Sequence, residues 1–199
     1  MKQSCNVERL GGSDRYETNL LILKAAGTDF TEIQICAGFA FPDSLSASST
    51  GRPILLTNGQ SLSENQMKYL ETLSESTDFY IIGGTPSVSN NVYAQVKSIL
   101  KGNNKRLGGI DRYETSKLVA EQFFPEGSEA VVFASAQAFP DGLSGSALAR
   151  ALECPIILTN TNATGWAQAY VAGSGATKAA VLGGPEHISD NAVKKIMGW

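Results

Sequence analysis

The same set of motifs occurs twice along this chain of 199 residues, in the same order. The opening motif RLGGSDRYET at Arg9–Thr18 returns as RLGGIDRYET at Arg106–Thr115. Three further motifs follow in each half: Phe-Pro-Asp, Pro-Ile-x-Leu-Thr-Asn and a Gly-Gly pair. A tandem duplication of this length predicts two units, residues 7–104 and 105–199, each large enough to bury a core of its own.

The composition is that of a globular protein. Hydrophobic residues make up 42% of the chain and charged residues 18%, which excludes intrinsic disorder. We expect no membrane span, since no run approaches the roughly 20 apolar residues that one needs. The net charge of −3 argues against nucleic-acid binding. Met1–Glu8 is polar, so we expect any export signal to lie on a longer parent chain.

Each unit alternates short apolar runs with helical patterns. The runs predict three strands in each unit, at 32–37, 53–57, 79–82, 130–134, 155–159 and 178–182. The helices are expected at 17–26, from 43, after Ser63, after Ser89, and at 114–124, 141–152, 165–172 and 189–197. Strands joined by helices pair in parallel. The sequence therefore predicts an α/β fold of two tandem Rossmann-like or flavodoxin-like units, each a small parallel sheet flanked by helices.

The residue types most used in catalysis are not repeated. His187 is the single histidine, and the three cysteines have no counterparts in the other unit. This set predicts no zinc site, and the glycine motifs that bind nucleotides are absent, so we expect neither metal nor cofactor. Asp43 and Asp141 do recur, at predicted helix starts, where capping is the simplest role. Catalytic residues in a duplicated protein usually occur in only one of the two units. A set of polar residues repeated in both therefore favours a binding function.

Arginine is concentrated in the opening motif, which holds four of the six arginines. Arg15 and Arg112 are the first candidates for ligand contact, and Arg9 and Arg106 the second. Guanidinium forks and the free N–H groups of a helix start suit a phosphate-bearing ligand. Each pair also has a structural alternative. Arg9 and Arg106 would brace the strand that links the units, whereas Arg15 and Arg112 would pair with the motif carboxylates Asp14, Glu17, Asp111 and Glu114.

The ordered motifs resemble the cell wall binding repeat 2 family of Gram-positive bacteria, over residues 7–199. The resemblance implies non-covalent anchoring of a secreted protein to an anionic cell-wall polysaccharide or a teichoic-acid-like polymer. It also implies Rossmann-like modules that typically come as three per chain, around a pseudo-threefold centre. Two units here would leave faces exposed, so we expect either self-association into a homo-oligomer or a third module in a longer chain.

The expected ligand contacts all lie in the opening motifs, at Arg9, Arg15, Tyr16, Thr18, Arg106, Arg112, Tyr113 and Thr115. The resemblance ties an Ile-Leu-Leu motif to anchoring, here at Ile54, Leu55, Leu56, Ile156, Ile157 and Leu158. Since a buried strand cannot touch a polar polymer, we interpret these six residues, with Asp43 and Asp141, as scaffold. Two alternatives stay open: a surface-layer module that binds other proteins, and a wall hydrolase using Asp43, Asp141 and His187.

Overall fold

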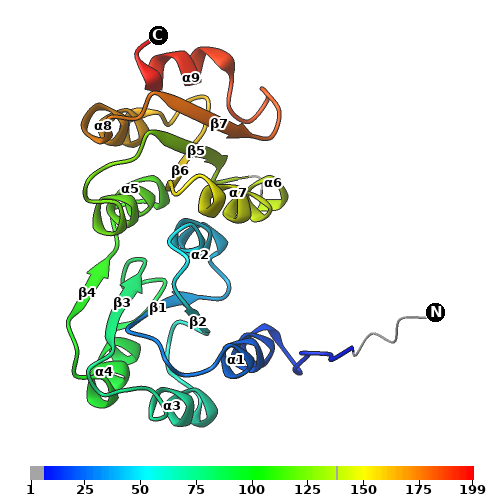
Figure 1. The fold of residues 1–199 in the computed structure, drawn as a ribbon, viewed down its shortest axis with the longest axis vertical. Helices are drawn as coiled ribbons and strands as arrows, with labels where there is room; N and C mark the ends of the chain where they lie inside the picture. Colours follow the sequence, from blue (N-terminus) through cyan, green and yellow to red (C-terminus); the bar gives the residue numbers. More distant parts are fainter. Residues whose placement is uncertain (1–6, 138) are drawn as a thin grey trace.

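The first unit is built on parallel strands in the order β2-β1-β3-β4, in a computed structural model that describes residues 7–137 and 139–199 (Figure 1). The strands are β1 (Glu32–Ala37), β2 (Ile54–Thr57), β3 (Asp78–Ile82) and β4 (Asn104–Leu107). Ile35 of the central strand β1 lies opposite Leu55 of β2 and Ile81 of β3, and all three are fully buried. The order 2-1-3-4 is that of a flavodoxin-like sheet, which confirms the predicted fold class.

Helices cover both faces of this sheet. They are α1 (Arg15–Ala26), α2 (Phe41–Ser48), α3 (Glu64–Leu70) and α4 (Asn90–Ile99). Leu20 of α1, Leu70 of α3 and Val96 of α4 share one buried cluster with the sheet residue Phe79. α2 packs on the opposite face, where Ala47 meets Cys36 and Ile82. The hydroxyls of Ser63 and Ser89 cap α3 and α4, as the sequence predicts.

The second unit repeats this plan with strands in the order β6-β5-β7. Its elements are α5 (Arg112–Phe123), β5 (Ala130–Ser135), α6 (Phe139–Leu143), α7 (Gly145–Ala151), β6 (Ile156–Thr159), α8 (Gly165–Ser174), β7 (Lys178–Leu182) and α9 (Asp190–Met197). Phe133, Ile157 and Ile196 belong to its main core. Among the described residues, nothing pairs with the outer edge of β7, where the first sheet has β4.

Two expectations about the helices after the first strands are wrong. The single helix expected at 141–152 is two short helices, α6 and α7, separated at Ser144. α2 starts at Phe41 rather than near Asp43, with Pro42 in its first turn, a position that proline tolerates well. The N-cap of α2 is Ala40, which has no side-chain capping bond. The carboxylate of Asp43 therefore does not cap this helix.

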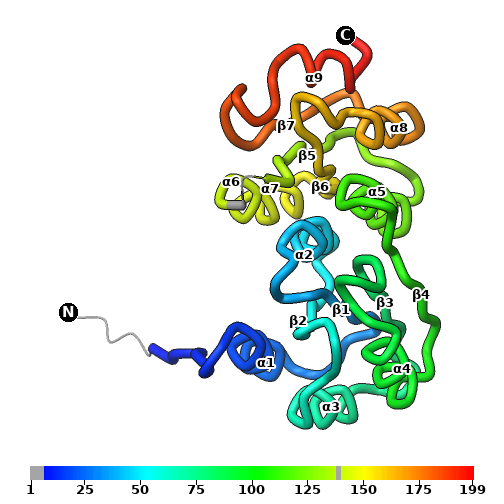
Figure 2. Tube along the Cα trace, turned by 180° about the vertical axis from the view of Figure 1, so that it is seen from behind, coloured from blue at the N-terminus to red at the C-terminus, as the bar shows by residue number. Residues whose placement is uncertain are grey.

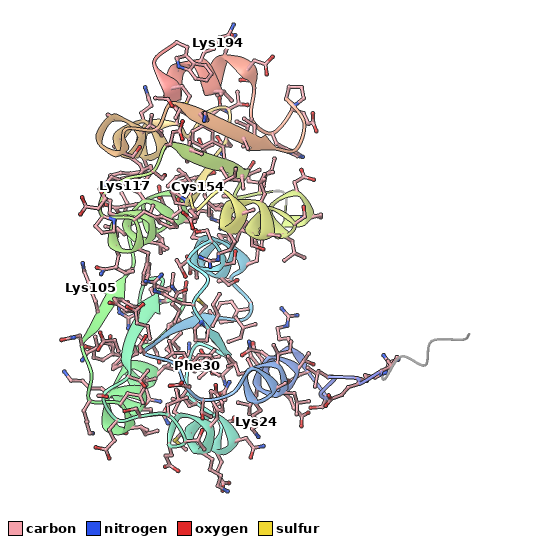
Figure 3. The ribbon with its side chains drawn as sticks, viewed as in Figure 1. Lys24, Phe30, Lys105, Lys117, Cys154 and Lys194 are labelled. Atoms are coloured by element: carbon pink, nitrogen blue, oxygen red, sulfur yellow. The ribbon has the colours of Figure 1, made fainter. Side chains whose placement is uncertain are left out.

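Two elements, the strand β4 and the helix α2, join the two units, and we call this region the junction. β4 lies at the start of the second unit in sequence but completes the sheet of the first, so the predicted boundary at 104/105 falls inside this strand. α2 lies between the two units, where it packs against α5 and α6 (Figures 1 and 2). Lys105 of β4 donates to the Gln122 side chain of α5 at 2.8 Å, and Figure 3 shows Lys105 below that helix.

The junction covers the Ile-Leu-Leu motif unequally in the two units. In β6, Ile156, Ile157 and Leu158 are all buried, and Leu45 of α2 packs in the same cluster as Ile156 and Leu158. In β2, Leu55 is buried but its neighbours on either side are only half-buried. The expectation of a strand buried on both faces therefore holds for the second unit and not fully for the first.

Candidate functional site

The opening motif is a turn locked onto the first turn of a helix. In the first unit, the Asp14 carboxylate accepts hydrogen bonds from the backbone N–H groups of Tyr16 and Glu17 and so caps α1. The Glu17 carboxylate reaches back to the Ser13 N–H at 2.6 Å, and the Thr18 hydroxyl accepts from the Gly12 N–H at 3.0 Å. A Cβ on Gly12 would lie 2.5 Å from Glu17, so only glycine fits there.

The second unit repeats three of these four bonds, all but the one from the Tyr16 N–H. Asp111 caps α5, Glu114 accepts from the Ile110 N–H at 2.5 Å, and the Thr115 hydroxyl accepts from the Gly109 N–H at 3.1 Å. The Thr115 hydroxyl also donates to the Asp111 carbonyl, and its side chain is buried. This placement favours a structural role for Thr115 and its counterpart Thr18. Asp, Glu and Thr are therefore needed to form the turn.

Arg15 and Arg112 extend from this turn toward the end of the first strand of their units. The Arg15 guanidinium donates to the Gly38 carbonyl at 2.8 Å, and that of Arg112 to the Ala136 carbonyl at 3.0 Å. Within the described residues neither arginine forms the ion pair with a motif carboxylate that the structural alternative proposed; those carboxylates accept from backbone N–H groups. Both arginines stay largely exposed, and each guanidinium has five N–H donors. A ligand can therefore reach them.

Arg106 and Arg9 occupy different surroundings although they are equivalent in sequence. Arg106 lies in β4 and donates to the carbonyls of Gly83, at 3.0 Å, and Val88, at 2.8 Å. Its partial burial lowers its pKa from the usual value for arginine. It is the brace that the structural alternative predicted. Arg9 is exposed, and the structure gives it no hydrogen-bond partner among the described residues.

Asp43 lies in a cleft at the junction, where the ends of β1 and β3 meet the second opening motif. The cleft has a volume of about 200 Å³ and is lined by Asp43, Ser87, Gly109 and Arg112, among others. A Cβ on Gly83 would lie 2.5 Å from the Asp43 carboxylate, so the Gly-Gly turn makes room for it. Burial raises the Asp43 pKa to about 6, against the opposing effects of a Ser87 hydrogen bond and the Arg112 charge.

A pair of surface grooves occupies equivalent places in the two units. Each lies between the first turn of the opening helix and the loop after the second strand, and we call them the paired grooves. The first has a volume of about 440 Å³. It is lined by Tyr16, by the carboxylates of Asp14 and Glu17, by Leu20 and Leu62, and by hydroxyl and amide side chains, including Asn58, Ser61, Ser63, Asn65 and Gln66. The second, of about 460 Å³, is lined by Tyr113 and Trp166 with Asp111, Ala163, Gly165 and Ala169.

Two kinds of residue that line or adjoin the paired grooves were not predicted as site residues from the sequence. Asn58 and Asn160 end the repeated Pro-Ile-x-Leu-Thr-Asn motif, and the Asn160 amide donates to the Tyr113 hydroxyl at 2.5 Å. Their repetition at strand ends was the available signal. Trp166 has no aromatic counterpart in the first unit, so the repeat could not point to it.

The unrepeated residues are not gathered into a site. Cys36 and Cys154 are buried free thiols, and Figure 3 shows Cys154 inside the second unit, while Cys5 lies outside the described residues. His187 approaches Glu186 at 3.9 Å. Within 7–137 and 139–199, no group of three or more acidic, histidine or cysteine side chains is placed to hold a metal ion. No helix in the same ranges is long and apolar enough to cross a membrane.

A family model, cell wall binding domain 2 (CWB2), matches residues 9–93 and 106–193, which is both copies of the fold described above. The chain belongs to the cell wall binding domain 2 family. It is 30% identical over 196 residues to the N-acetylmuramoyl-L-alanine amidase LytC of Bacillus subtilis (strain 168), a match covering 96% of this chain and 39% of that protein. It is also 28% identical over 156 residues to the amidase enhancer of Bacillus subtilis (strain 168), covering 76% and 21%.

Solved structures of cell wall proteins share the fold. Cwp8 from Clostridium difficile superposes with a TM-score of 0.82 at 28% identity, over 96% of this chain and 33% of that one. Cwp6 from Clostridium difficile gives a TM-score of 0.77 at 28% identity, over 98% and 34%. The chain thus spans about a third of each of these proteins. This CWB2 chain is accordingly an α/β protein that corresponds to part of the longer proteins it matches.

Proposed function

We propose that this chain is a non-catalytic module that holds a secreted protein at the cell wall by binding an anionic wall polymer non-covalently. The observation that carries the proposal is the pair of equivalent grooves. A polymer repeats one chemical group along its length, so it can meet the same site twice. Two linked sites of modest affinity gain strongly, because the first contact raises the effective concentration for the second.

The side chains around the paired grooves suit a charged saccharide. Tyr16, Tyr113 and Trp166 offer apolar faces with polar edges, which suit the mixed surface of a sugar ring. Hydroxyl and amide groups in the first groove can exchange hydrogen bonds with sugar hydroxyls. Arg15 and Arg112 lie beside these tyrosines in the chain and supply positive charge at the same end of each sheet.

The residues offered for a hydrolase do not form a repeated constellation. Asp43 is buried at the junction next to Arg112, whereas its counterpart Asp141 is half-exposed and has no following motif over it. His187 is present in the second unit only. We therefore assign no catalytic role to the chain. In the amidase LytC, which is much longer, we infer that the shared region is the part that binds the wall.

Removing the two charges of Arg15 and Arg112 is expected to abolish retention of the protein on cell walls. Arg15→Gln with Arg112→Gln removes both charges and keeps a polar side chain at each position. Retention is measured by co-sedimentation with purified walls, and folding by circular dichroism. High salt is expected to weaken binding of the native chain, because exposed charges are screened.

The matched control is Lys68→Gln with Lys178→Gln, two exposed lysines outside the grooves. Both double variants change the net charge from −3 to −5. Retention lost in the arginine variant and kept in the lysine variant supports the proposal. Undiminished binding to walls stripped of their anionic polymer would count against the anionic ligand and favour the protein-binding alternative.

A further inference from the structure

Within residues 7–137 and 139–199, the outer edge of β7 lacks the strand that its counterpart β3 has. In the first sheet the N–H groups of Phe79 and Gly83 donate to the carbonyls of Asn103 and Leu107, at 2.9 and 2.8 Å. The counterparts of Phe79 and Gly83 are Ala179 and Gly183, and within the described part of the chain their N–H groups have no backbone acceptor. Every residue of β7 is at least partly exposed, unlike those of β3. An open strand edge is a template for pairing with another chain.

The segment that would fill such an edge is present at the start of the same chain. Residues 7–12 carry the first copy of the sequence that forms β4, and they run outward from α1, away from both units (Figures 1 and 2). Leu107 of β4 is 2% exposed, whereas its counterpart Leu10 is 36% exposed. Arg9, the counterpart of the brace Arg106, has no partner among the described residues.

One helix in each unit likewise exposes an apolar side chain whose counterpart in the other unit is buried. Val119 of α5 packs against the first sheet and is only 1% exposed, while its counterpart Ile22 on α1 is 49% exposed. Leu45 of α2 packs against the second sheet and is only 5% exposed, while its counterpart Leu143 on α6 is 59% exposed. Ile54 and Leu56 are half-buried because nothing equivalent to Leu45 reaches them. Leu10, Ile22 and Leu143 are thus exposed at positions whose counterparts the junction buries.

We propose that a second copy of this chain docks head to tail, with its segment 7–10 added to β7 as a parallel fourth strand. The register of β3 with β4 carries over and places Glu8 opposite Ala180, Arg9 opposite Val181 and Leu10 opposite Leu182. Arg9 then donates to the carbonyls of Gly183 and Ile188, as Arg106 does to those of Gly83 and Val88.

The same docking brings the two helix faces together. Leu143 of one copy covers Ile54 and Leu56 of the next, and Ile22 meets the sheet face beside Leu182. The occupant is a copy of this chain because one chain carries both halves, and because the junction shows that these halves fit. The contact joins different surfaces of the two copies, so it either closes into a ring or continues as an open chain.

A register-specific cross-link tests the strand pairing. Adjacent strands lie about 4.8 Å apart, within the Cα separation that a disulfide bridges. Glu8→Cys with Ala180→Cys, in a Cys5→Ser background, is expected to give a ladder of covalent oligomers on mild oxidation without any wall material. The control pairs Glu8→Cys with Asn162→Cys, an exposed position after β6 at the far edge of the sheet. Equal ladders from both pairs, or none from either, would overturn the proposal.

Light scattering of the uncross-linked chain is the second measurement. The mean mass of the native chain is expected to rise above the monomer mass of 21.1 kDa as the protein concentration increases. The mass of the Leu10→Asp, Ile22→Asp variant is expected to remain at 21.1 kDa. Ile110→Asp, which changes an exposed apolar side chain outside both faces, is expected to associate like the native chain. A native chain that remains at 21.1 kDa at every concentration sinks the proposal, whatever the result of the wall-binding experiment.

Discussion

Replacing Leu45 by alanine is expected to lower the free energy of unfolding by about 2–5 kcal/mol, the usual cost of deleting a buried leucine side chain. Leu45 inserts from α2 into the cluster on the second sheet, with Ala134 and Leu158. The loss therefore falls on the junction. Unfolding in urea is followed by circular dichroism and by the fluorescence of Trp166 and Trp199, which both lie in the second unit.

The matched variant is Leu143→Ala, at the same repeat position but on an exposed surface. It is expected to change stability by less than about 0.5 kcal/mol at low protein concentration, as exposed sites usually do. If the circular dichroism and fluorescence curves differ in midpoint for Leu45→Ala but not for Leu143→Ala, the second unit unfolds separately from the first in that variant. Equal effects at the two positions would contradict the junction described above.

The buried carboxyl of Asp43 is expected to make the protein lose stability as the pH rises. Its pKa in the folded protein is about 6, above the ordinary value of 3.8, so the folded state holds its proton more tightly than the unfolded state does. The stabilisation is complete below pH 3.8 and is lost as the pH rises through 6. A shift of this size corresponds to roughly 3 kcal/mol.

The measurement compares urea unfolding of the native chain and of Asp43→Asn, at pH 4 and pH 7. Asparagine stays neutral, so the variant is expected to lack roughly 2.4 kcal/mol of the change in stability between pH 4 and pH 7. Asp141→Asn is the control, because its side chain is half-exposed and has no opening motif packed over it. A native chain and an Asp43→Asn chain with parallel pH profiles would rule out this role for the buried carboxyl.

Much of the fold follows from local sequence patterns. The apolar runs gave the six main strands, and Ser63 and Ser89 cap the helices expected after them. β4 was not among the strands predicted from apolar runs, because Asn-Lys-Arg-Leu has none; only the bracing alternative for Arg106 implied a strand there. It forms because β3 offers an edge and because Arg106 and Leu107 find partners there. The break between α6 and α7 at Ser144 does have a signal in the flanking Gly142 and Gly145, which the prediction of one helix did not weigh.

The candidate site was predictable in part. The residues that make the opening turn are fixed by their spacing, since Asp, Glu and Thr must reach backbone N–H groups within a few residues. The sequence did not predict which of Arg9 and Arg106 is available to a ligand, because both lie in the same motif. Arg106 differs only through the carbonyls of Gly83 and Val88, which the chain brings to it from elsewhere. The ligand roles of Arg15, Arg112, Tyr16 and Tyr113 remain predictions.

The sequence by itself determined the duplication, the α/β class and the turn that opens each unit, because these depend on residues close together in the chain. The tertiary structure alone decided which copy of each motif is covered. Leu45 and Leu143, Leu107 and Leu10, and Asp43 and Asp141 are the same residue types in the same motifs, yet one of each pair is buried and the other is not. Burial depends on what lies opposite in space, and only one junction exists between two units.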